Sequence, residues 1–301
     1  LFGVVVSPGS KKMKCEKIFK DLCLLSESRG KDACGFVFQE EASIHVLKRP
    51  FKASKVVKTP EFKNLLHKAV LANALEKPFS LMGHTRMVTN GNSNEHVNNQ
   101  PVMKHGMVCV HNGIVVNDAL LWEEKSLERE FLVDTEIILS LVDLYVKQGE
   151  SLINAVISSF ACMKGANSIA LTKSDFLGVI LATSNGSLFT AYDERDEFAL
   201  FASEKYILEK VIAGHGLCDV FDSLKIEQLV PGKGRAITFH EGRLEKTDFS
   251  LNGGEKGFPI ECGVISNRPI LDSPFSPKNI SVGTPNSSLK ELEKLCEVDV
   301  N

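Results

Sequence analysis

The sequence has no apolar run that is long enough to cross a membrane. Its longest runs, such as 1–6 and 107–110, are strand-sized and fall far short of the roughly 18 residues that a spanning helix needs. The first residues do not combine a basic stretch, an apolar stretch and a small-residue cleavage site, which is the pattern of a secretory signal. We therefore expect a cytoplasmic protein with no membrane partner.

The chain also lacks paired cysteines and a strong charge of either sign. Its eight cysteines stand singly, without the Cys-x-x-Cys or Cys/His spacing of zinc sites, which predicts reduced, mostly buried thiols and no metal. The 35 Lys and Arg residues nearly balance the 38 Asp and Glu residues. Bulk electrostatics therefore give no reason to expect a nucleic acid partner.

Short strands and a few amphipathic helices make up most of the chain. Apolar runs rich in β-branched and aromatic residues predict strands at 1–6, 34–38, 79–83, 107–111, 168–172, 177–182, 188–192, 198–202 and 235–239. Apolar residues at helical spacing predict helices at 17–25 and 134–146. The later half runs from strand to strand without βαβ alternation. This pattern favours an α+β fold in which helices flank antiparallel sheets.

The composition changes near the end of the chain. Residues 1–245 have the pattern of one domain, whereas the stretch beyond about residue 250 is rich in Gly, Pro, Ser and Asn. We therefore predict a linker or docking tail over 246–301.

Glycine and polar residues interrupt three of the apolar strands in a way that core packing does not require. Segment 28–36 reads Ser-Arg-Gly-Lys-Asp-Ala-Cys-Gly-Phe, segment 83–91 reads Gly-His-Thr-Arg-Met-Val-Thr-Asn-Gly, and segment 110–117 reads Val-His-Asn-Gly-Ile-Val-Val-Asn. Two shorter motifs accompany them: Asn-Asn-Gln-Pro at 98–101 and Asp-Thr-Glu at 134–136.

In order and spacing these motifs resemble the class II glutamine amidotransferases. That family carries Arg-Gly-x-Asp, Gly-His-Thr-Arg-x-x-Thr, Asn-x-(His/Gln)-Pro, His-Asn-Gly and Asp-Thr-Glu, and an ordered set is far more specific than one short motif. The resemblance covers residues 1–245 as a glutaminase domain. It implies a four-layer αββα sandwich of two mostly antiparallel sheets flanked by helices, the fold of the N-terminal nucleophile hydrolases.

The resemblance also implies how glutamine would be held. Arg86 would form a bidentate ion pair with the substrate α-carboxylate, a role for which a planar guanidinium is better suited than a lysine ammonium. Asp134 would take the α-ammonium, Thr89 would add a hydroxyl contact, and Gln100 would complete the substrate-binding set. Without the resemblance, Asp134 would read as the cap of the helix that follows it.

A second group of residues would serve the reaction itself. The side-chain amide of Asn112 and the backbone N–H of Gly113 would form the oxyanion hole. Arg29 and Asp32 would brace the nucleophile loop from outside the contact shell. His84 and His111 read as buried structural histidines, since both lie inside strand-like segments.

The nucleophile of the family is an N-terminal cysteine whose thiolate attacks the amide carbon while its own α-amine relays the proton. The family begins Cys-Gly-(Ile/Leu)-Phe-Gly, and this sequence begins Leu1-Phe2-Gly3. The register therefore predicts a Cys-Gly pair just before Leu1. The alternative is a non-catalytic, glutamine-binding or regulatory relative that keeps its pocket. We favour the first interpretation, because a pocket without chemistry has no need of both Asn112 and Gly113.

The predicted function is hydrolysis of glutamine to glutamate and ammonia, with ammonia delivered to a synthase domain or partner subunit. No synthase is visible in the sequence, and the resemblance implies no cofactor. A sugar is one candidate acceptor, although Asn90 and Gln100 stand where sugar-amidating members usually have histidine. A homo-oligomer is left open. A third interpretation is a hydrolase of the same fold acting on a different amide, which would not need Arg86 and Asp134.

Overall fold

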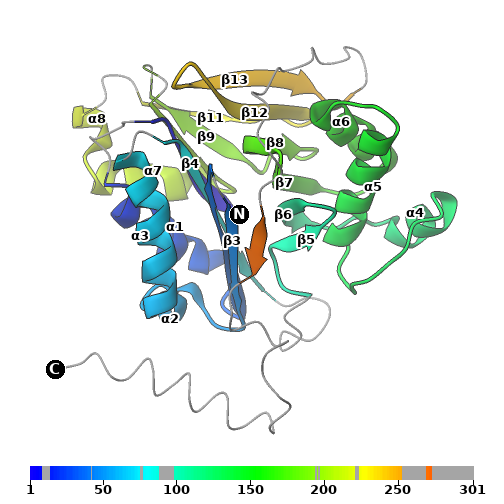
Figure 1. Ribbon diagram of the computed structural model, residues 1–301, viewed down its shortest axis with the longest axis horizontal. Helices are drawn as coiled ribbons and strands as arrows, with labels where there is room; N and C mark the ends of the chain where they lie inside the picture. Colours follow the sequence, from blue (N-terminus) through cyan, green and yellow to red (C-terminus); the bar gives the residue numbers. More distant parts are fainter. Residues whose placement is uncertain are drawn as a thin grey trace, which may run out of the picture.

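The computed structural model describes residues 1–8, 14–41, 43–74, 77–87, 98–193, 195, 197–220, 224–252 and 269–272. The described strands form two sheets (Figure 1). The order in the larger sheet is β11 (Lys225–Gln228), β9 (Phe189–Tyr192), β10 (Phe198–Ala202), β1 (Phe2–Val6), β4 (Phe79–Arg86), β2 (Ala33–Glu40), β3 (Ile44–Arg49) and β14 (Ile270–Asp272). The order in the smaller sheet is β13 (Arg243–Ser250), β12 (Lys233–His240), β8 (Phe176–Thr183), β7 (Asn167–Lys173), β6 (Met107–Gly113) and β5 (Val102–Lys104).

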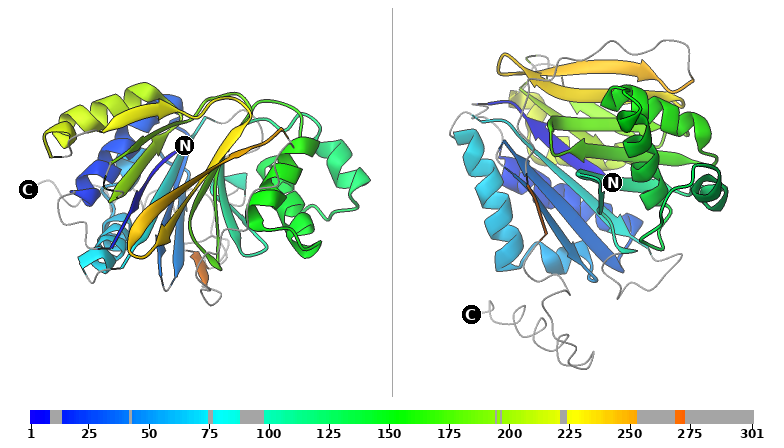
Figure 2. Two further views of the ribbon diagram at one scale, coloured as in Figure 1. Left: turned by 90° about the horizontal axis from the view of Figure 1, so that it is seen from above. Right: turned by 45° about the vertical axis from the view of Figure 1, so that its right-hand side comes forward.

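Helices cover the outer face of each sheet, so that the molecule has four layers (Figure 2). The larger sheet carries α1 (Cys15–Ser26), α2 (Ala53–Val56), α3 (Pro60–Ala74), α7 (Lys205–Gly214) and α8 (Leu217–Val220), and α1 continues into the short 3-10 helix η1 (Glu27–Arg29). The smaller sheet carries α4 (Asp118–Glu124), α5 (Thr135–Lys147) and α6 (Leu152–Cys162). The predicted αββα sandwich is confirmed. Among the described strand pairs, all are antiparallel except β14 with β3.

Successive side chains of a strand point to opposite faces of its sheet, so the apolar side chains pack into three separate cores. Phe36 of β2 and Phe62 of α3 pack edge to face, with ring centroids 4.9 Å apart, in the core beneath the helices of the larger sheet. Ile138 of α5 lies in the corresponding core of the smaller sheet. Met82 of β4 and Val110 of β6 belong to the third core, which fills the space between the sheets. The strands in the middle of the larger sheet are therefore buried on both faces, which explains their nearly continuous apolar sequences.

A buried polar bridge also joins the two sheets. The Gln39 amide nitrogen of β2 donates to the Phe176 carbonyl of β8 at 3.0 Å and to the Thr172 hydroxyl of β7 at 2.5 Å. Its amide oxygen accepts a hydrogen bond from Ser80 of β4. Because buried amide groups are costly without partners, this bridge favours one alignment of the sheets.

The predicted strands all occur, and both predicted helices form within one or two residues of their expected ends. β13 runs to Ser250, past the predicted domain boundary at residue 245, which itself stays a prediction. Most of the predicted tail lies outside the described residues. Within it, Ile270–Asp272 pairs with Ile44–Val46 as an edge strand.

Four of the described cysteines, Cys15, Cys23, Cys34 and Cys109, are buried. Burial raises the pKa of Cys15 to about 12 and raises the pKa of the other three even further. These thiols stay protonated and act as small apolar core residues, in line with the prediction of mostly buried thiols.

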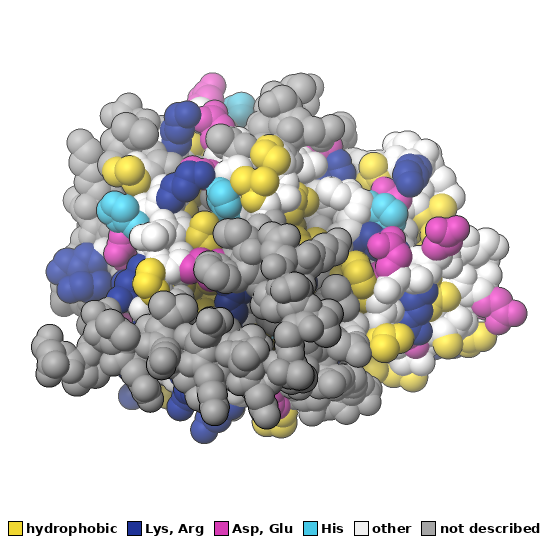
Figure 3. All heavy atoms as spheres, turned by 60° about the horizontal axis from the view of Figure 1, so that its bottom comes forward, with side chains coloured by type: hydrophobic (Ala, Val, Ile, Leu, Met, Phe, Trp, Pro, Cys, Tyr) yellow, Lys and Arg dark blue, Asp and Glu magenta, His cyan; other side chains and the backbone are white. Residues whose placement is uncertain are grey.

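The surface carries both signs of charge. On the face shown in Figure 3, acidic and basic side chains are interspersed outside the grey region, which agrees with the net charge of -3. No helix in the described part of the chain is long and apolar enough to span a membrane.

Helix α1 offers a matched test of the outer core. Leu22 is fully buried against the larger sheet, whereas Leu24 on the same helix is 43% exposed. We expect Leu22→Ala to lower the free energy of unfolding by about 2–5 kcal/mol, because a buried leucine leaves a cavity. Leu24→Ala should change it by no more than about 0.5 kcal/mol. Urea denaturation of the two variants measures the difference, and equal losses would show that the helix is packed differently.

Candidate active site

A pocket lies where β4 of the larger sheet and β6 of the smaller sheet end side by side. Its volume is about 510 Å³. The walls come from the ends of these strands, from the loop 98–100 and from the start of α5. The pocket therefore brings together residues from all five sequence motifs, 28–36, 83–91, 98–101, 110–117 and 134–136.

The two predicted oxyanion-hole residues end strand β6. The side-chain oxygen of Asn112 lies 2.9 Å from Nε2 of His84 and 3.4 Å from the α-nitrogen of Leu1. Gly113 has a φ of +140°, and a Cβ at this position would collide with the carbonyl oxygen of Ala166. The glycine is thus required by the backbone, independently of any chemistry.

Arg86 reaches the pocket from the last residue of β4. Its Nη1 donates to the carbonyl oxygen of Asn98 and to the side-chain oxygen of Asn99, both at 2.8 Å. Partial burial lowers the pKa of Arg86, while the carboxylates of Asp134 and Asp32 act in the opposite direction. The guanidinium is therefore fixed at one end and faces a pocket in which it is incompletely solvated.

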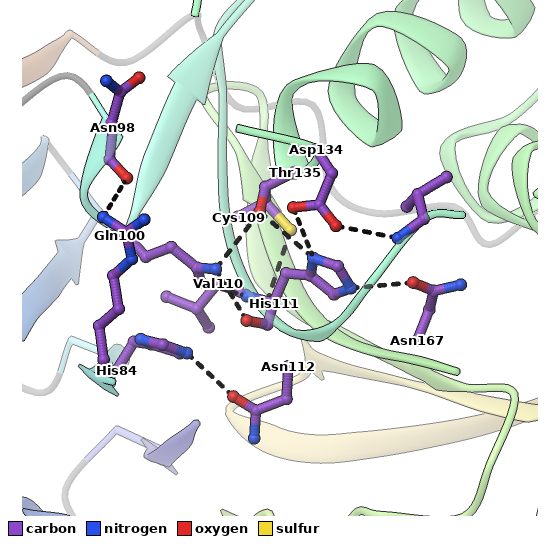
Figure 4. Close-up of polar contacts among 12 residues, drawn as sticks. His84, Asn98, Gln100, Cys109, Val110, His111, Asn112, Asp134, Thr135 and Asn167 are labelled. Carbon is purple, nitrogen blue, oxygen red and sulfur yellow. Dashed lines mark hydrogen bonds and ion pairs between the residues drawn. The ribbon is translucent and has the colours of Figure 1, made fainter. Parts of the chain in front are cut away.

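Asp134 does not cap α5, although its place in the sequence suggests that role. It stands at the N-cap position with helical backbone angles, φ -64° and ψ -23°, and its side chain makes no capping hydrogen bond. The carboxylate instead accepts a hydrogen bond of 2.9 Å from the backbone N–H of Val115 and lies 4.0 Å from Nδ1 of His111 (Figure 4). This arrangement leaves the carboxylate on the pocket wall.

His111 is buried, and both of its ring nitrogens have partners. Nε2 lies 3.0 Å from the side-chain oxygen of Asn167, and Nδ1 lies 3.2 Å from the Thr135 hydroxyl (Figure 4). Burial lowers its pKa, against the opposing effect of Asp134. These contacts suit the predicted structural role, since they tie the end of β6 to both β7 and α5.

Gln100 was expected to bind substrate, but its amide group forms hydrogen bonds with the backbone of His111. Its Nε2 donates to the carbonyl oxygen of His111 at 2.8 Å and to the Thr135 hydroxyl at 3.3 Å. Its Oε1 accepts from the His111 N–H at 2.5 Å. The side chain thus continues the strand-like pairing of β6 next to the pocket, and a direct contact with substrate stays a prediction.

Of the two residues predicted to brace the nucleophile loop, Arg29 lies among the residues that line the pocket and Asp32 does not. Arg29 also forms an ion pair of 2.8 Å with Glu204. Asp32 is exposed, and its backbone N–H donates to the carbonyl oxygen of Arg86. Between them, Gly30 approaches the Arg86 backbone so closely that a Cβ would collide with it. Thr89 lies outside the described residues.

Leu1 lies at the edge of the same site. Its α-nitrogen is buried and lies 3.4 Å from both the Asn112 side-chain oxygen and the Ser203 hydroxyl. Burial is the main reason why the pKa of an α-amino group here falls to about 5. A charged ammonium is therefore disfavoured at this position.

Several curated proteins are similar in sequence to part of this chain. No family model matches the chain. The glutamine–fructose-6-phosphate aminotransferase (isomerizing) of Xylella fastidiosa (strain 9a5c) is 30% identical over 149 residues, which are 48% of this chain and 22% of that protein. The enzyme of the same name from Escherichia coli (strain K12) is 36% identical over 109 residues, which are 35% of this chain and 18% of that protein.

Structural comparison points to the same fold. A glutamine phosphoribosylpyrophosphate (PRPP) amidotransferase from B. subtilis, complexed with ADP and GMP, matches with a TM-score of 0.58 and 19% identity over 84% of this chain and 49% of its own. The chain resembles the class II glutamine amidotransferases. The predicted resemblance and the predicted fold are thereby confirmed, and the chain spans about a fifth of the curated relatives and about half of the solved chain.

Glu136 of the Asp-Thr-Glu motif has a structural role that the sequence did not reveal. The fully buried carboxylate of Glu136 accepts hydrogen bonds of 2.7 Å from the backbone N–H groups of Glu130 and Phe131. It also pairs at 2.6 Å with Lys104, which is nearly as buried. These bonds hold the loop that carries Leu132 to the pocket rim. The glutamate of Asp-Thr-Glu was the available signal, but nothing in the sequence linked it to Lys104.

This buried pair generates a stability prediction. Glu136→Leu leaves the Lys104 ammonium buried without its main partner and should lower the free energy of unfolding by about 3–5 kcal/mol. Adding Lys104→Met should recover part of that loss. Lys147→Met, which removes the exposed lysine of the pair with Asp143, should cost about 0–1 kcal/mol. Denaturant unfolding of the four proteins checks this, and a double variant as unstable as Glu136→Leu alone would contradict it.

Proposed function

We propose that this chain is a glutaminase module that hydrolyses glutamine to glutamate and ammonia and delivers the ammonia to a synthase domain or subunit. The observation that carries the proposal is the place of Leu1. Its α-nitrogen lies at the predicted oxyanion residue Asn112, at the edge of the pocket.

The strand register supports a nucleophile ahead of Leu1. β1 and β4 run antiparallel, with Phe2 opposite Gly83. Continued backwards, this register sets Leu1 opposite His84, the preceding residue opposite Thr85, and the residue before that opposite Arg86. At about 3.3 Å per residue, a cysteine two positions ahead of Leu1 would therefore enter the pocket beside Arg86. A peptide N–H at Leu1 also suits this buried position better than an ammonium.

The pocket would serve the reaction as follows. The thiolate of that cysteine forms a bond to the carboxamide carbon of glutamine, and the carbonyl oxygen becomes an oxyanion. Donors from the Asn112 side chain and the Gly113 backbone stabilise that charge. The C–N bond then breaks, the α-amine of the cysteine passes the thiol proton to the leaving nitrogen, and ammonia departs. Water finally hydrolyses the thioester to glutamate.

Glutamine itself would be held by its two charged groups, which both stand on the α-carbon. Arg86, fixed by Asn98 and Asn99, would bind the α-carboxylate, and Asp134 would bind the α-ammonium. One oxygen of Asp134 is used by the Val115 N–H, so the carboxylate is already oriented before a ligand arrives. Thr89 and Gln100 complete the proposed binding set.

The proposed acceptor is a phosphorylated sugar. The names of the relatives pair glutamine with a sugar phosphate or with phosphoribosylpyrophosphate, which supports a phosphorylated sugar as the class of acceptor. The synthase partner and a cytoplasmic location likewise remain predictions from the sequence.

Arg86 gives a test of glutamine recognition. Arg86→Lys keeps the charge but loses the planar pair of donors, so KM for glutamine should rise about 10- to 100-fold, the equivalent of one charge-assisted hydrogen bond of about 1.5–3 kcal/mol. Arg29→Lys, at a half-exposed position on the rim, should change KM less than about threefold. Steady-state glutaminase kinetics measure both, and equal KM values for the two variants would remove Arg86 from the binding site.

The nucleophile is tested on the mature protein. Intact mass and N-terminal sequencing should reveal a Cys-Gly pair ahead of Leu1, and the same sample should release ammonia from glutamine. Replacement of that cysteine by alanine should abolish the release while leaving the thermal unfolding temperature unchanged within about 3 °C. A mature chain that begins at Leu1 and is inert toward glutamine would overturn the enzymatic proposal.

A further inference from the structure

His84 makes a contact that the predicted reaction does not use. It lies on β4, only 6% of its surface is exposed, and its Nε2 is 2.9 Å from the side-chain oxygen of Asn112 on the other sheet (Figure 4). Its second ring nitrogen, Nδ1, is buried and has no hydrogen-bond partner among the described residues. A structural histidine would normally have both nitrogens satisfied, as His111 has.

The neighbours of Asn112 determine which way its amide points. The Leu1 nitrogen lies 3.4 Å from one end of that amide. In the proposed enzyme this nitrogen belongs to a peptide bond and can only donate, so the end that faces it must be the oxygen. The same oxygen lies against Nε2 of His84, and that nitrogen must therefore carry the hydrogen. Nδ1 is then the unprotonated nitrogen.

We infer that His84 is a positioning residue: its Nε2–H holds the Asn112 oxygen, and this hydrogen bond turns the amide N–H groups toward the developing oxyanion. The inference rests on the proposed glutaminase reaction. Without the His84 donor, only the longer contact of 3.4 Å with the Leu1 nitrogen would oppose a rotation of the Asn112 amide by 180°, which would present its oxygen to the negative charge. An oxyanion hole depends on donors that are fixed in advance.

The ring is poorly suited to act as a base. Its Nε2 is occupied by Asn112, and burial keeps the pKa of His84 well below its usual value. The neighbouring positive charge of Arg86 and the ring of His111 act in the same direction. His84 therefore stays neutral at physiological pH and keeps a single tautomer.

Two substitutions of His84 by side chains of equal length separate the effect of the hydrogen-bond donor from the effect of side-chain shape. In His84→Gln the amide nitrogen is as many bonds from Cβ as Nε2 is, so it can still donate to Asn112. His84→Met has the same length and no donor. We expect kcat for glutamine hydrolysis to fall about 10- to 100-fold in His84→Met and no more than about threefold in His84→Gln, with KM unchanged in both, since a displaced oxyanion donor affects the transition state alone.

Equal losses of kcat in the two variants, or a rise in KM in place of a fall in kcat, would overturn the role. Thermal unfolding of both proteins accompanies the kinetics. If His84→Met is unfolded, the comparison moves to His84→Gln against His84→Asn, whose shorter amide cannot reach Asn112, and the same outcomes apply.

Nitrogen NMR of protein with ¹⁵N-labelled histidine tests the tautomer without any turnover. The His84 resonances, identified by their loss in His84→Gln, should show a protonated Nε2 and an unprotonated Nδ1 from pH 6 to 8. A protonated Nδ1 would refute the positioning role even in an active glutaminase. If the protein shows the expected tautomer but does not hydrolyse glutamine, the contact between His84 and Asn112 stands. Only the proposed function is then refuted.

Discussion

The two sheets pack face to face, and the site depends on this contact. Met82 of β4 and Val110 of β6 lie in the core between the sheets, and each is two residues ahead of a pocket residue, His84 and Asn112. The polar bridge from Gln39 opposes sliding of one sheet over the other, because any shift would leave its buried amide unpaired. A contact of 2.9 Å between residues on different sheets is therefore kept by apolar packing around it and by this polar bridge.

Much of the fold could be predicted because burial on both faces leaves a simple signal. β1 and β10 are continuous apolar runs, and α5 carries a clear apolar stripe. Helix α3 is only weakly amphipathic, and the parallel strand β14 is three residues long, so neither was predicted. Short edge strands and weak stripes are decided by tertiary contacts that one sequence does not display.

The site was predicted from ordered motifs, and the structure brings Arg86, Asn112, Gly113 and Asp134 into one pocket. What the motifs could not supply is the direction of each side chain. Asp134 binds the Val115 N–H in place of its own helix, and Gln100 turns its amide toward the backbone of His111. Such choices depend on which donor lies nearest in space, and the pairing of Glu136 with Lys104 is another example.

The buried cysteines have a consequence for chemical labelling. An alkylating electrophile reacts with thiolate, and burial keeps Cys15, Cys23, Cys34 and Cys109 protonated and out of contact with solvent. A chloroketone analogue of glutamine, guided into the pocket by its amino-acid end, would meet little competition from these four sites. Among the described cysteines, Cys218 is exposed and Cys162 is partly exposed, so modification of these two thiols reports the background reactivity. The cores of this protein therefore contribute to the selectivity of covalent inhibitors as well as to its stability.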